Sequence, residues 1–471
     1  MSDSEFSTSQ VGTNGATPYA HQMDNVQILE ELVWSIDMGQ GDFSLLLVRC
    51  NYRDLQGQLI DALHEATDLD IAELTLKPKE TTLYSAILAS VEQSSPAALS
   101  VLGLDQVEDL DEVLVTANNM RESFRQRFSF PLLLWVDDRV MDSIRHRMPD
   151  FKSWGAATFR FDLETETLLA QLQVACDRYL EGALQRATFT PVTALLTPQD
   201  AREAELAVAE LGRRQATLPP DLMGGLEFRR GSRLYGATPR PTPEICEEAL
   251  AHYQASLSHW QTAENFLGVG LARFYSSLCY ARRGEWEAAK QERQACLDDF
   301  KAAARPDLVA RFVGSLGPVL VQLGEWGELE RCLGEWRSRH QNQPAELAQD
   351  WSLQAELARH RQDWPQMQAD AERAISIWTE QIDAESVPLA YRLQRCQALA
   401  QQGQVATAID SLEAARRSYP PKADPAAFVD LLNQLRRLYF QERQYQKAFE
   451  TKQERRRALE NRKMNSVDAS S

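Results

Sequence analysis

Gly284-Glu285-Trp286, Gly324-Glu325-Trp326, Gln362-Asp363-Trp364, Gly403-Gln404-Val405 and Arg443-Gln444-Tyr445 are five copies of one short motif. The third residues of successive copies are 40, 38, 41 and 40 positions apart. Three positions further on, every copy has an apolar residue: Ala289, Leu329, Met367, Ala408 and Ala448. Each motif lies between two helix-like segments, so the predicted unit is a helix, a tight turn and a second helix. A regular period of this length indicates a solenoid, in which each helical hairpin buries its apolar face against the next.

The first copy shows the physical basis of the unit. Gly284 supplies the permissive backbone that a tight turn between helices needs. Trp286 begins the second helix, where a large ring can fill the wedge between two helices. Ala289 and Cys296 share one helix face, and their small side chains allow a neighbouring helix to approach closely. The alternative is an irregular helical bundle with tryptophans placed by chance, which the five near-equal spacings disfavour.

These units resemble tetratricopeptide repeats, whose turn carries a glycine, an acid and an aromatic residue, with a small residue three positions later. Gly317, Trp351 and Pro420 match further positions of that family. The present units are longer than the usual length of about 34 residues, and three residues depart at motif positions: Leu329, Gln362 and Arg443. The resemblance covers residues 243–463. It implies an α-solenoid of about five hairpins, a scaffold for protein interactions whose inner groove takes a peptide or a partner helix.

Residues 25–162 show a different pattern, in which apolar runs alternate with helical segments. Runs suited to buried strands occupy residues 43–48, 71–76, 97–102 and 131–136. Helices are predicted at residues 26–38, 55–66, 81–93 and 118–127. This alternation predicts a three-layer α/β domain with a mostly parallel sheet.

Acidic residues follow two of these strands, at Asp105 and at Asp137-Asp138, which raises the question of a nucleotide site. A phosphate-binding loop would read G-x-x-x-x-G-K-[ST], whose amides cradle the phosphates while the lysine neutralises their charge. After the first strand, residues 49–55 contain no glycine, and no Gly-Lys pair occurs anywhere in the chain. We therefore expect no catalysis and no bound cofactor.

The domain nevertheless resembles a degenerate AAA-like NTPase domain of the STAND type, on residues 43–51, 102–105, 132–136 and 148–154. Active members of that class use ATP as a switch in regulating the assembly of effectors. Because the phosphate loop is missing, the resemblance carries over the fold without the activity. Arg49, Asn51 and Arg53 are candidates to contact an anionic ligand at the carboxyl end of the first strand. The alternative is that they cap or solvate the loop.

By the spacing of tetratricopeptide repeats, seven polar residues line the groove of the later hairpins: Gln349, Ser352, Glu356, Arg359, Gln397, Asn433 and Arg437. The corresponding positions of the first two hairpins include Leu271, Phe274 and Leu278, which are apolar. This gradient suggests that the N-terminal α/β domain covers the apolar end and leaves the polar end open to a partner.

The remaining segments are predicted from their composition. Residues 1–24 and 464–471 are polar and are expected to be disordered tails. Residues 163–216 read as two connecting helices, and residues 217–242 as a linker rich in proline and glycine. The linker carries Arg229-Arg230-Gly231-Ser232-Arg233, which either docks on an acidic surface of the same chain or stays solvated.

The composition narrows the function class. The chain of 471 residues has a net charge of −18, which disfavours nucleic acid as a partner. The absence of a secretory signal or a long apolar window, together with seven cysteines in no paired motif, favours a cytoplasmic protein with reduced thiols and no membrane insertion. We expect a non-catalytic scaffold that binds a protein or peptide; the alternative is an NTP-binding switch with an unconventional phosphate site. The oligomeric state is left open.

Overall fold

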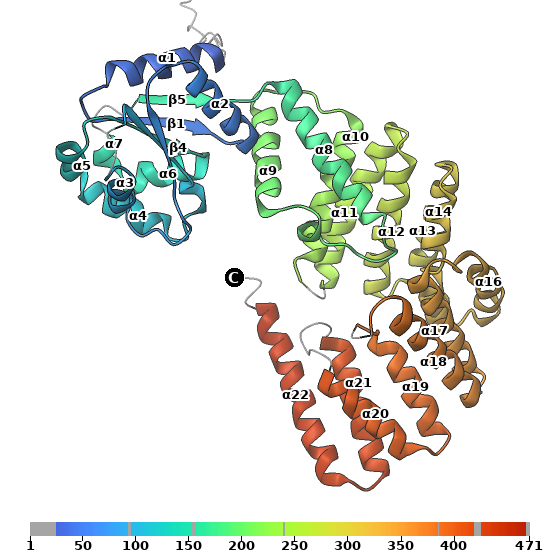
Figure 1. Cartoon of the computed structure of the whole chain (residues 1–471). Helices are drawn as coiled ribbons and strands as arrows, with labels where there is room; N and C mark the ends of the chain where they lie inside the picture. Colours follow the sequence, from blue (N-terminus) through green and yellow to red (C-terminus); the bar gives the residue numbers. More distant parts are fainter. Residues whose placement is uncertain are drawn as a thin grey trace, which may run out of the picture. The chain divides into compact units, whose positions relative to one another are not determined.

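The computed structural model describes residues 25–92, 96–152, 157–238, 241–384, 386–418 and 425–467. The chain divides into two compact units, Met1–Thr167 and Leu168–Ser471. The first is an α/β domain and the second is a row of helical hairpins (Figure 1). The predicted fold class, an α/β domain followed by an α-solenoid, is therefore confirmed.

The sheet of the first unit has five parallel strands in the order β2-β3-β4-β1-β5. The strands are β1 (Ser44–Cys50), β2 (Ile71–Thr75), β3 (Ala98–Leu102), β4 (Pro131–Val136) and β5 (Ala157–Phe161). The four predicted strands are all present. The edge strand β5 was not predicted, because only Phe159 and Phe161 of its residues are buried and its apolar signal is short.

Helices cover both faces of this sheet, as the three-layer prediction requires. In Figure 1, α1 (Asn25–Met38) and α2 (Arg53–Glu65) lie on one side, and α3 (Leu83–Ser90), α4 (Leu110–Asn119) and α6 (Asp138–Arg147) lie on the other. The shorter elements are α5 (Arg121–Arg127), α7 (Pro149–Lys152) and the 3-10 turn η1 (Leu104–Gln106). Asp137 begins α6 as a cap, since its side chain accepts a hydrogen bond from the Val140 N–H at 2.7 Å. Of the residues that carried the resemblance, Ser153 and Trp154 lie outside the described residues.

The second unit begins with α8 (Thr165–Ala183), a 3-10 turn η2 (Val192–Ala194) and α9 (Pro198–Arg213). The helices that follow are α10 (Pro220–Gly236), α11 (Pro243–Thr262), α12 (Phe266–Arg283), α13 (Trp286–Ala302), α14 (Pro306–Val313), α15 (Leu316–Leu323), α16 (Trp326–Arg339), α17 (Pro344–His360), α18 (Trp364–Gln381), α19 (Leu389–Gln401), α20 (Val405–Ser418), α21 (Pro425–Gln441) and α22 (Tyr445–Val467). The five motifs join α12 to α13, α15 to α16, α17 to α18, α19 to α20 and α21 to α22. Each is the turn of a helical hairpin, as predicted.

One hydrogen-bonded turn recurs at all five motifs. In the first, Gly284 has a φ of 82°, and the Glu285 N–H donates to the Tyr280 carbonyl at 2.9 Å. This arrangement closes the preceding helix with a left-handed residue and satisfies carbonyls that the helix leaves free. Gln362 and Arg443 adopt the same conformation, with φ values of 58° and 57°, although they are not glycines. The turn therefore depends on the packing of the hairpin as well as on glycine.

In the described residues, the same turn also occurs at three places that the motif did not mark: Gln215, Glu264 and Ala304. Glu264 and Ala304 both have a φ of 54°, and the next residue in each case donates back across the turn, Asn265 to Trp260 and Arg305 to Phe300. The residues in the left-handed conformation at positions 264, 284, 304 and 324 therefore follow one another at intervals of 20 positions. In this part of the array, the period of 40 residues consists of two equal helix-turn units.

The residue three positions beyond the third residue of each motif lies in the core. Ala289, Leu329, Met367 and Ala408 have no exposed surface, and Ala448 is 6% exposed. The aromatic rings at the start of the second helices are half-buried in the first three hairpins and exposed in the last. The small and apolar residues therefore lie where the helices approach one another.

The predicted linker at residues 217–242 is wrong, because most of it forms α10. Three of its glycines are places of close helix packing. A Cβ atom on Gly224 would lie 2.6 Å from the Trp260 ring, one on Gly225 would lie 2.7 Å from Cys176, and one on Gly231 would lie 2.8 Å from Tyr253. Pro220 occupies the first turn of α10, where a missing N–H costs nothing. The glycines therefore allow helices to approach one another.

The predicted C-terminal tail also begins too early, because α22 continues to Val467. Residues 1–24, 468–471 and Pro420 lie outside the described residues. Across the described ranges, we find no helix that combines the length and the apolar character needed to cross a membrane.

Candidate functional site

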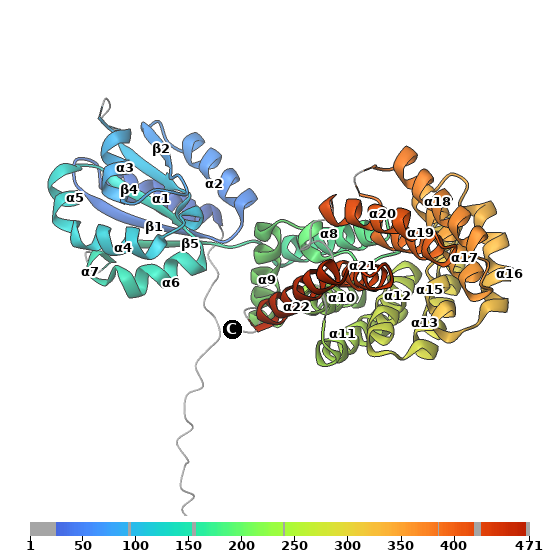
Figure 2. The same cartoon turned by 90° about the horizontal axis from the view of Figure 1, so that it is seen from below.

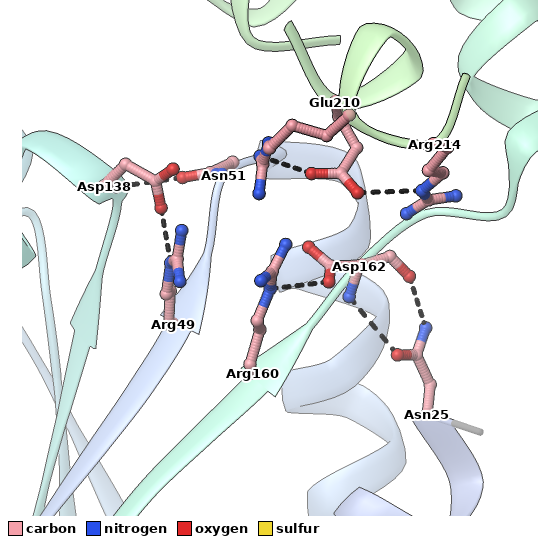
Figure 3. Close-up of polar contacts among 9 residues, drawn as sticks. Asn25, Arg49, Asn51, Asp138, Arg160, Asp162, Glu210 and Arg214 are labelled. Atoms are coloured by element: carbon pink, nitrogen blue, oxygen red, sulfur yellow. Dashed lines mark hydrogen bonds and ion pairs between the residues drawn. The ribbon is translucent and has the colours of Figure 1, made fainter. Parts of the chain in front are cut away.

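The carboxyl ends of β1 and β4 bring two of the predicted anion-contacting residues together (Figure 3). The Nε of Arg49 pairs with a carboxylate oxygen of Asp138, and the Asn51 side chain accepts a hydrogen bond from the Asp138 N–H at 2.9 Å. Burial disfavours the charged carboxylate, but the hydrogen bond from Arg49 and its charge lower the pKa of Asp138. These side chains therefore hold the start of α6 against the end of β1.

The third predicted residue, Arg53, faces an acidic group as well. Its Nη2 atom lies 3.4 Å from Oδ2 of Asp105, which follows β3. The connection from β1 to α2 consists of two residues, Asn51 and Tyr52, and the Tyr52 side chain is buried. A loop of this length is too short to wrap around phosphates as a glycine-rich loop does. The geometry favours the capping role for Arg49, Asn51 and Arg53.

The neighbouring edge strand holds α1 by polar contacts that Figure 3 also shows. Arg160 of β5 pairs with Asp162 at 2.6 Å, and the Asn25 side chain donates to the Asp162 carbonyl at 2.9 Å. This group of contacts fixes the first helix to the sheet.

The inner face of the array begins on α12, which carries the predicted apolar groove positions Leu271, Phe274 and Leu278. Leu271 and Phe274 are buried in one apolar cluster with residues of α8 and of the segment that follows it. The Thr190 N–H donates to the Tyr275 hydroxyl at 3.0 Å, and Arg311 donates to the Leu184 carbonyl at 3.0 Å. Residues 184–196 and α8 of the same unit therefore cover this face.

The later inner face is formed by α17, α19 and α21, the first helices of three successive hairpins, which lie side by side in Figure 1 and Figure 2. All seven predicted groove residues lie on these helices. Ser352 is buried and donates to Oε1 of Gln394 at 2.9 Å. Gln394 in turn donates to Glu356 at 2.7 Å, and Arg359 donates to the other oxygen of Glu356 at 2.6 Å. The Ser352 side chain, predicted to line the groove, is instead buried and joins α17 to α19.

Gln394 was missed by the sequence prediction. It lies nine positions before the left-handed Gly403, and the same position in the other hairpins holds Tyr275, Ser315, Leu353 and Gln434, of which the first three are buried. A polar residue at a core position of the repeat needs a hydrogen-bond partner, so this position was the available signal.

The other predicted groove residues differ in exposure. Gln349 is half-buried, and its Nε2 atom lies 3.4 Å from the Gly314 carbonyl. Gln397 and Asn433 are half-buried and Arg437 is exposed. With Glu356 and Arg359, which are also partly exposed, they form what we call the polar inner face: Gln349, Glu356, Arg359, Gln397, Asn433 and Arg437.

A pocket of roughly 350 Å³ lies between α9 and α10. Its apolar lining includes Val208 and Leu226, and its rim carries Arg229, Arg230 and Arg233. Arg233 forms an ion pair with Glu205 of α9, in which both side chains are largely exposed. Figure 3 shows a further ion pair on α9, between Arg214 and Glu210 at 2.8 Å.

The described part of the chain contains no cluster of three or more His, Cys, Asp or Glu side chains that could hold a metal ion. The cysteines are free thiols, and all but Cys332 are buried. Burial raises the pKa of the Cys176 thiol to about 11, so it is not a reactive thiolate at neutral pH.

No protein-family model and no curated protein matches this chain. Among solved structures, the chain is similar to a Signal Transduction ATPase with Numerous Domains (STAND) protein with a tetratricopeptide repeat sensor from Pyrococcus horikoshii. The two are 11% identical with a TM-score of 0.38, and the match covers 93% of this chain and 84% of that one. The order of parts in the present chain, a parallel-sheet domain followed by helical repeats, rests on its own strands and hairpins.

Proposed function

We propose that this protein is a non-catalytic scaffold that binds a protein or peptide along the polar inner face of α17, α19 and α21. The observation that carries the proposal comes from the first hairpins. There, residues 184–196 of the same chain lie on the inner face formed by α12 and α14. The same face of the later hairpins carries polar, partly exposed side chains. A segment from another protein can lie there as the chain's own segment lies on the earlier hairpins.

The residues of the polar inner face favour an extended, polar ligand. Gln397 and Asn433 have amide groups that can both donate and accept hydrogen bonds from a peptide backbone. Glu356 and Arg359 are already paired with each other, so a ligand would exchange or extend their hydrogen bonds. Arg437 supplies an exposed positive charge at the C-terminal end of this face.

The test combines capture of partners from native cells with titration of a captured partner. The variant Gln397→Ala/Asn433→Ala/Arg437→Glu is expected to weaken binding at least tenfold. Arg417→Glu is the matched control, because Arg417 is exposed on α20, the second helix of a hairpin. Unchanged affinity after the triple substitution, or an equal loss in the control, would contradict the proposal.

An NTP-regulated switch is the second candidate function. It is favoured by the gathering of Arg49, Asn51, Asp105 and Asp138 after parallel strands, since ligands of open α/β sheets bind at the carboxyl ends of strands. Calorimetry with ATP and Mg²⁺ separates the two candidates. Micromolar binding that Arg49→Ala abolishes favours the switch, and the absence of heat favours the scaffold.

A further inference from the structure

Three aromatic side chains are exposed on the last hairpin. Phe440 of α21 is 66% exposed, and Tyr445 and Phe449 of α22 are 58% and 59% exposed. The rings of Phe440 and Tyr445 are 5.5 Å apart, edge to face, and Tyr445 and Phe449 share one face of α22. We call these three residues the end patch. Three rings exposed to this extent present on the order of 300 Å² of apolar surface, a size at which a surface patch is often functional.

The register of the repeats shows what these positions do elsewhere in the array. Tyr445 lies two positions after the left-handed residue of its turn, as Trp326 does in an earlier hairpin. The Trp326 ring is stacked on His360 of the following hairpin, with ring centres 4.3 Å apart and planes 11° apart. This position therefore contacts the next hairpin of the array.

Phe449 occupies the sixth position after the left-handed residue, which also contacts the next hairpin. Lys290 at this position binds Glu328 at 2.8 Å, and Gln368 accepts a hydrogen bond from Gln402 at 2.9 Å. In the other two hairpins, the sixth position holds Glu330 and Ile409. Glu330 pairs with Arg361, and Ile409 is buried in the apolar cluster of the last two hairpins.

The side chain at the sixth position matches what covers it. Lys290 faces carboxylates and Gln368 faces an amide. Glu330 faces an arginine, and Ile409 faces an apolar cluster. An aromatic residue at this position in α22 is therefore matched to an apolar helix. Within the described residues, no segment follows α22 in the row (Figure 1).

The last hairpin differs in charge from the rest of the chain. Residues 425–467 contain ten Lys and Arg and five Asp and Glu, a net charge of +5, whereas the whole chain has a net charge of −18. Close to the end patch in sequence, Arg443, Lys447 and Lys452 are exposed together with Glu442 and Glu450, which gives a local net charge of +1. An acidic partner is attracted to this hairpin, and a second copy of the hairpin is repelled.

We propose that the end patch docks an amphipathic helix of a partner protein, with one apolar face and acidic flanks, in the place of the first helix of a next hairpin. The docked helix continues the interface that already joins successive hairpins. It buries Phe440, Tyr445 and Phe449, and its acidic flanks face Arg443 and Lys452. Phe440 lies three positions after Arg437 on α21, so the end patch adjoins the C-terminal end of the polar inner face.

The experiment uses the full chain and designed helical peptides as probes. One fluorescent peptide has leucine and phenylalanine on one face and glutamate on both flanks; a second has lysine in place of glutamate; a third has the composition of the first without the apolar face. Fluorescence anisotropy is expected to show saturable binding of the acidic amphipathic peptide, at least tenfold tighter than the other two. The variant Phe440→Ala/Tyr445→Ala/Phe449→Ala is expected to weaken this binding at least tenfold.

Three further variants separate binding at the end patch from other causes of binding. Phe266→Ala removes an aromatic residue that is 45% exposed on α12 and is expected to leave binding unchanged. Lys452→Glu is expected to reduce the preference for the acidic peptide several-fold with the fold intact by circular dichroism. Gln397→Ala/Asn433→Ala, on the polar inner face, is expected to leave peptide binding unchanged, which separates this proposal from the proposed function.

Several results would overturn the proposal. They are the absence of saturable binding, equal binding of acidic and basic peptides, and undiminished binding by the triple alanine variant. Dimerisation of the wild-type chain in sedimentation experiments, lost in the triple alanine variant, would identify a second copy as the occupant and would equally overturn it.

Discussion

The two halves of the array share one backbone plan but differ in what fills their interior. In residues 220–339, a large apolar cluster surrounds Phe228, whose ring centre lies 4.8 Å from that of Tyr275 and 5.4 Å from that of Trp260. In residues 344–459, the clusters are smaller, and polar contacts such as that between Ser352 and Gln394 join successive hairpins.

This difference shows that the turn and the closely packed position after it determine the hairpin, whereas the other positions are free to serve stability or binding. The first half is closed by α8 and residues 184–196, so its inner face can be apolar. The second half has a polar inner face, which can stay in contact with water until a ligand arrives.

The junction of the halves is held by a buried ion pair. His340 and Asp350 have no exposed surface, and Nδ1 of His340 lies 2.6 Å from Oδ2 of Asp350. The other ring nitrogen lies 2.6 Å from the Ala310 carbonyl. When His340 is protonated, each ring nitrogen carries a proton that faces an acceptor. This pair joins the end of α16 to α14 and α17.

The largest expected effect comes from the apolar half. Phe228→Ala is expected to lower the free energy of unfolding by about 4 kcal/mol, because it opens a cavity among packed rings. Phe440→Ala, an equally large change on an exposed side chain, is expected to change it by less than about 0.5 kcal/mol. Urea unfolding followed by circular dichroism measures both. Similar losses in the two variants would show that the contrast in packing is unimportant for stability.

At the junction, Asp350→Asn is expected to lower the free energy of unfolding by roughly 3 kcal/mol, because it leaves the buried His340 without its counter-charge. Glu330→Gln is the matched control, since Glu330 forms an exposed ion pair with Arg361 and such pairs contribute little. Urea unfolding measures the stability of both variants. If Asp350→Asn lowered the free energy of unfolding no more than Glu330→Gln, a structural role for the buried pair would be ruled out.

The same pair predicts a pH dependence. Burial opposes the charge on His340, but the hydrogen bond and charge of Asp350 raise its pKa above the ordinary value. Burial also raises the pKa of Asp350, so both groups hold protons more tightly when folded. The stabilisation is therefore complete below the ordinary histidine pKa of about 6.5 and is lost as the pH rises through the folded pKa. Thermal unfolding of the wild type should show this loss, and His340→Gln should flatten the profile above pH 6.5.

The smallest expected effect lies in the turns, which both halves share. Gln362→Gly is expected to raise the free energy of unfolding by about 0.5–1 kcal/mol, because a side chain at positive φ is strained. Gly403→Ala, which adds a side chain at a φ of 81°, is expected to lower it by about 1 kcal/mol. Thermal unfolding measures both changes. If both substitutions changed the free energy of unfolding in the same direction, the backbone conformation of the turn would not control its stability.

Local patterns in the sequence were sufficient for the elements that depend on them. The hairpins follow from a turn and an apolar residue at fixed spacing, and β1, β3 and β4 follow from continuous apolar runs, because these signals lie within one segment. For the same reason, the seven candidate groove residues lie on the first helices of their hairpins. Ser352 was misassigned because its exposure depends on Gln394, which is 42 residues away in the chain.

By itself, the sequence of this protein determined the period of the array, the position of its turns and the class of its first domain. Only the tertiary structure showed that the glycines of α10 pack against Trp260, Cys176 and Tyr253, that residues 184–196 cover the first hairpins, and that Arg49 faces Asp138. The physical reason is distance along the chain. Periodicity and turn chemistry are local, whereas close approach, cover and charge pairing depend on segments that meet only after folding.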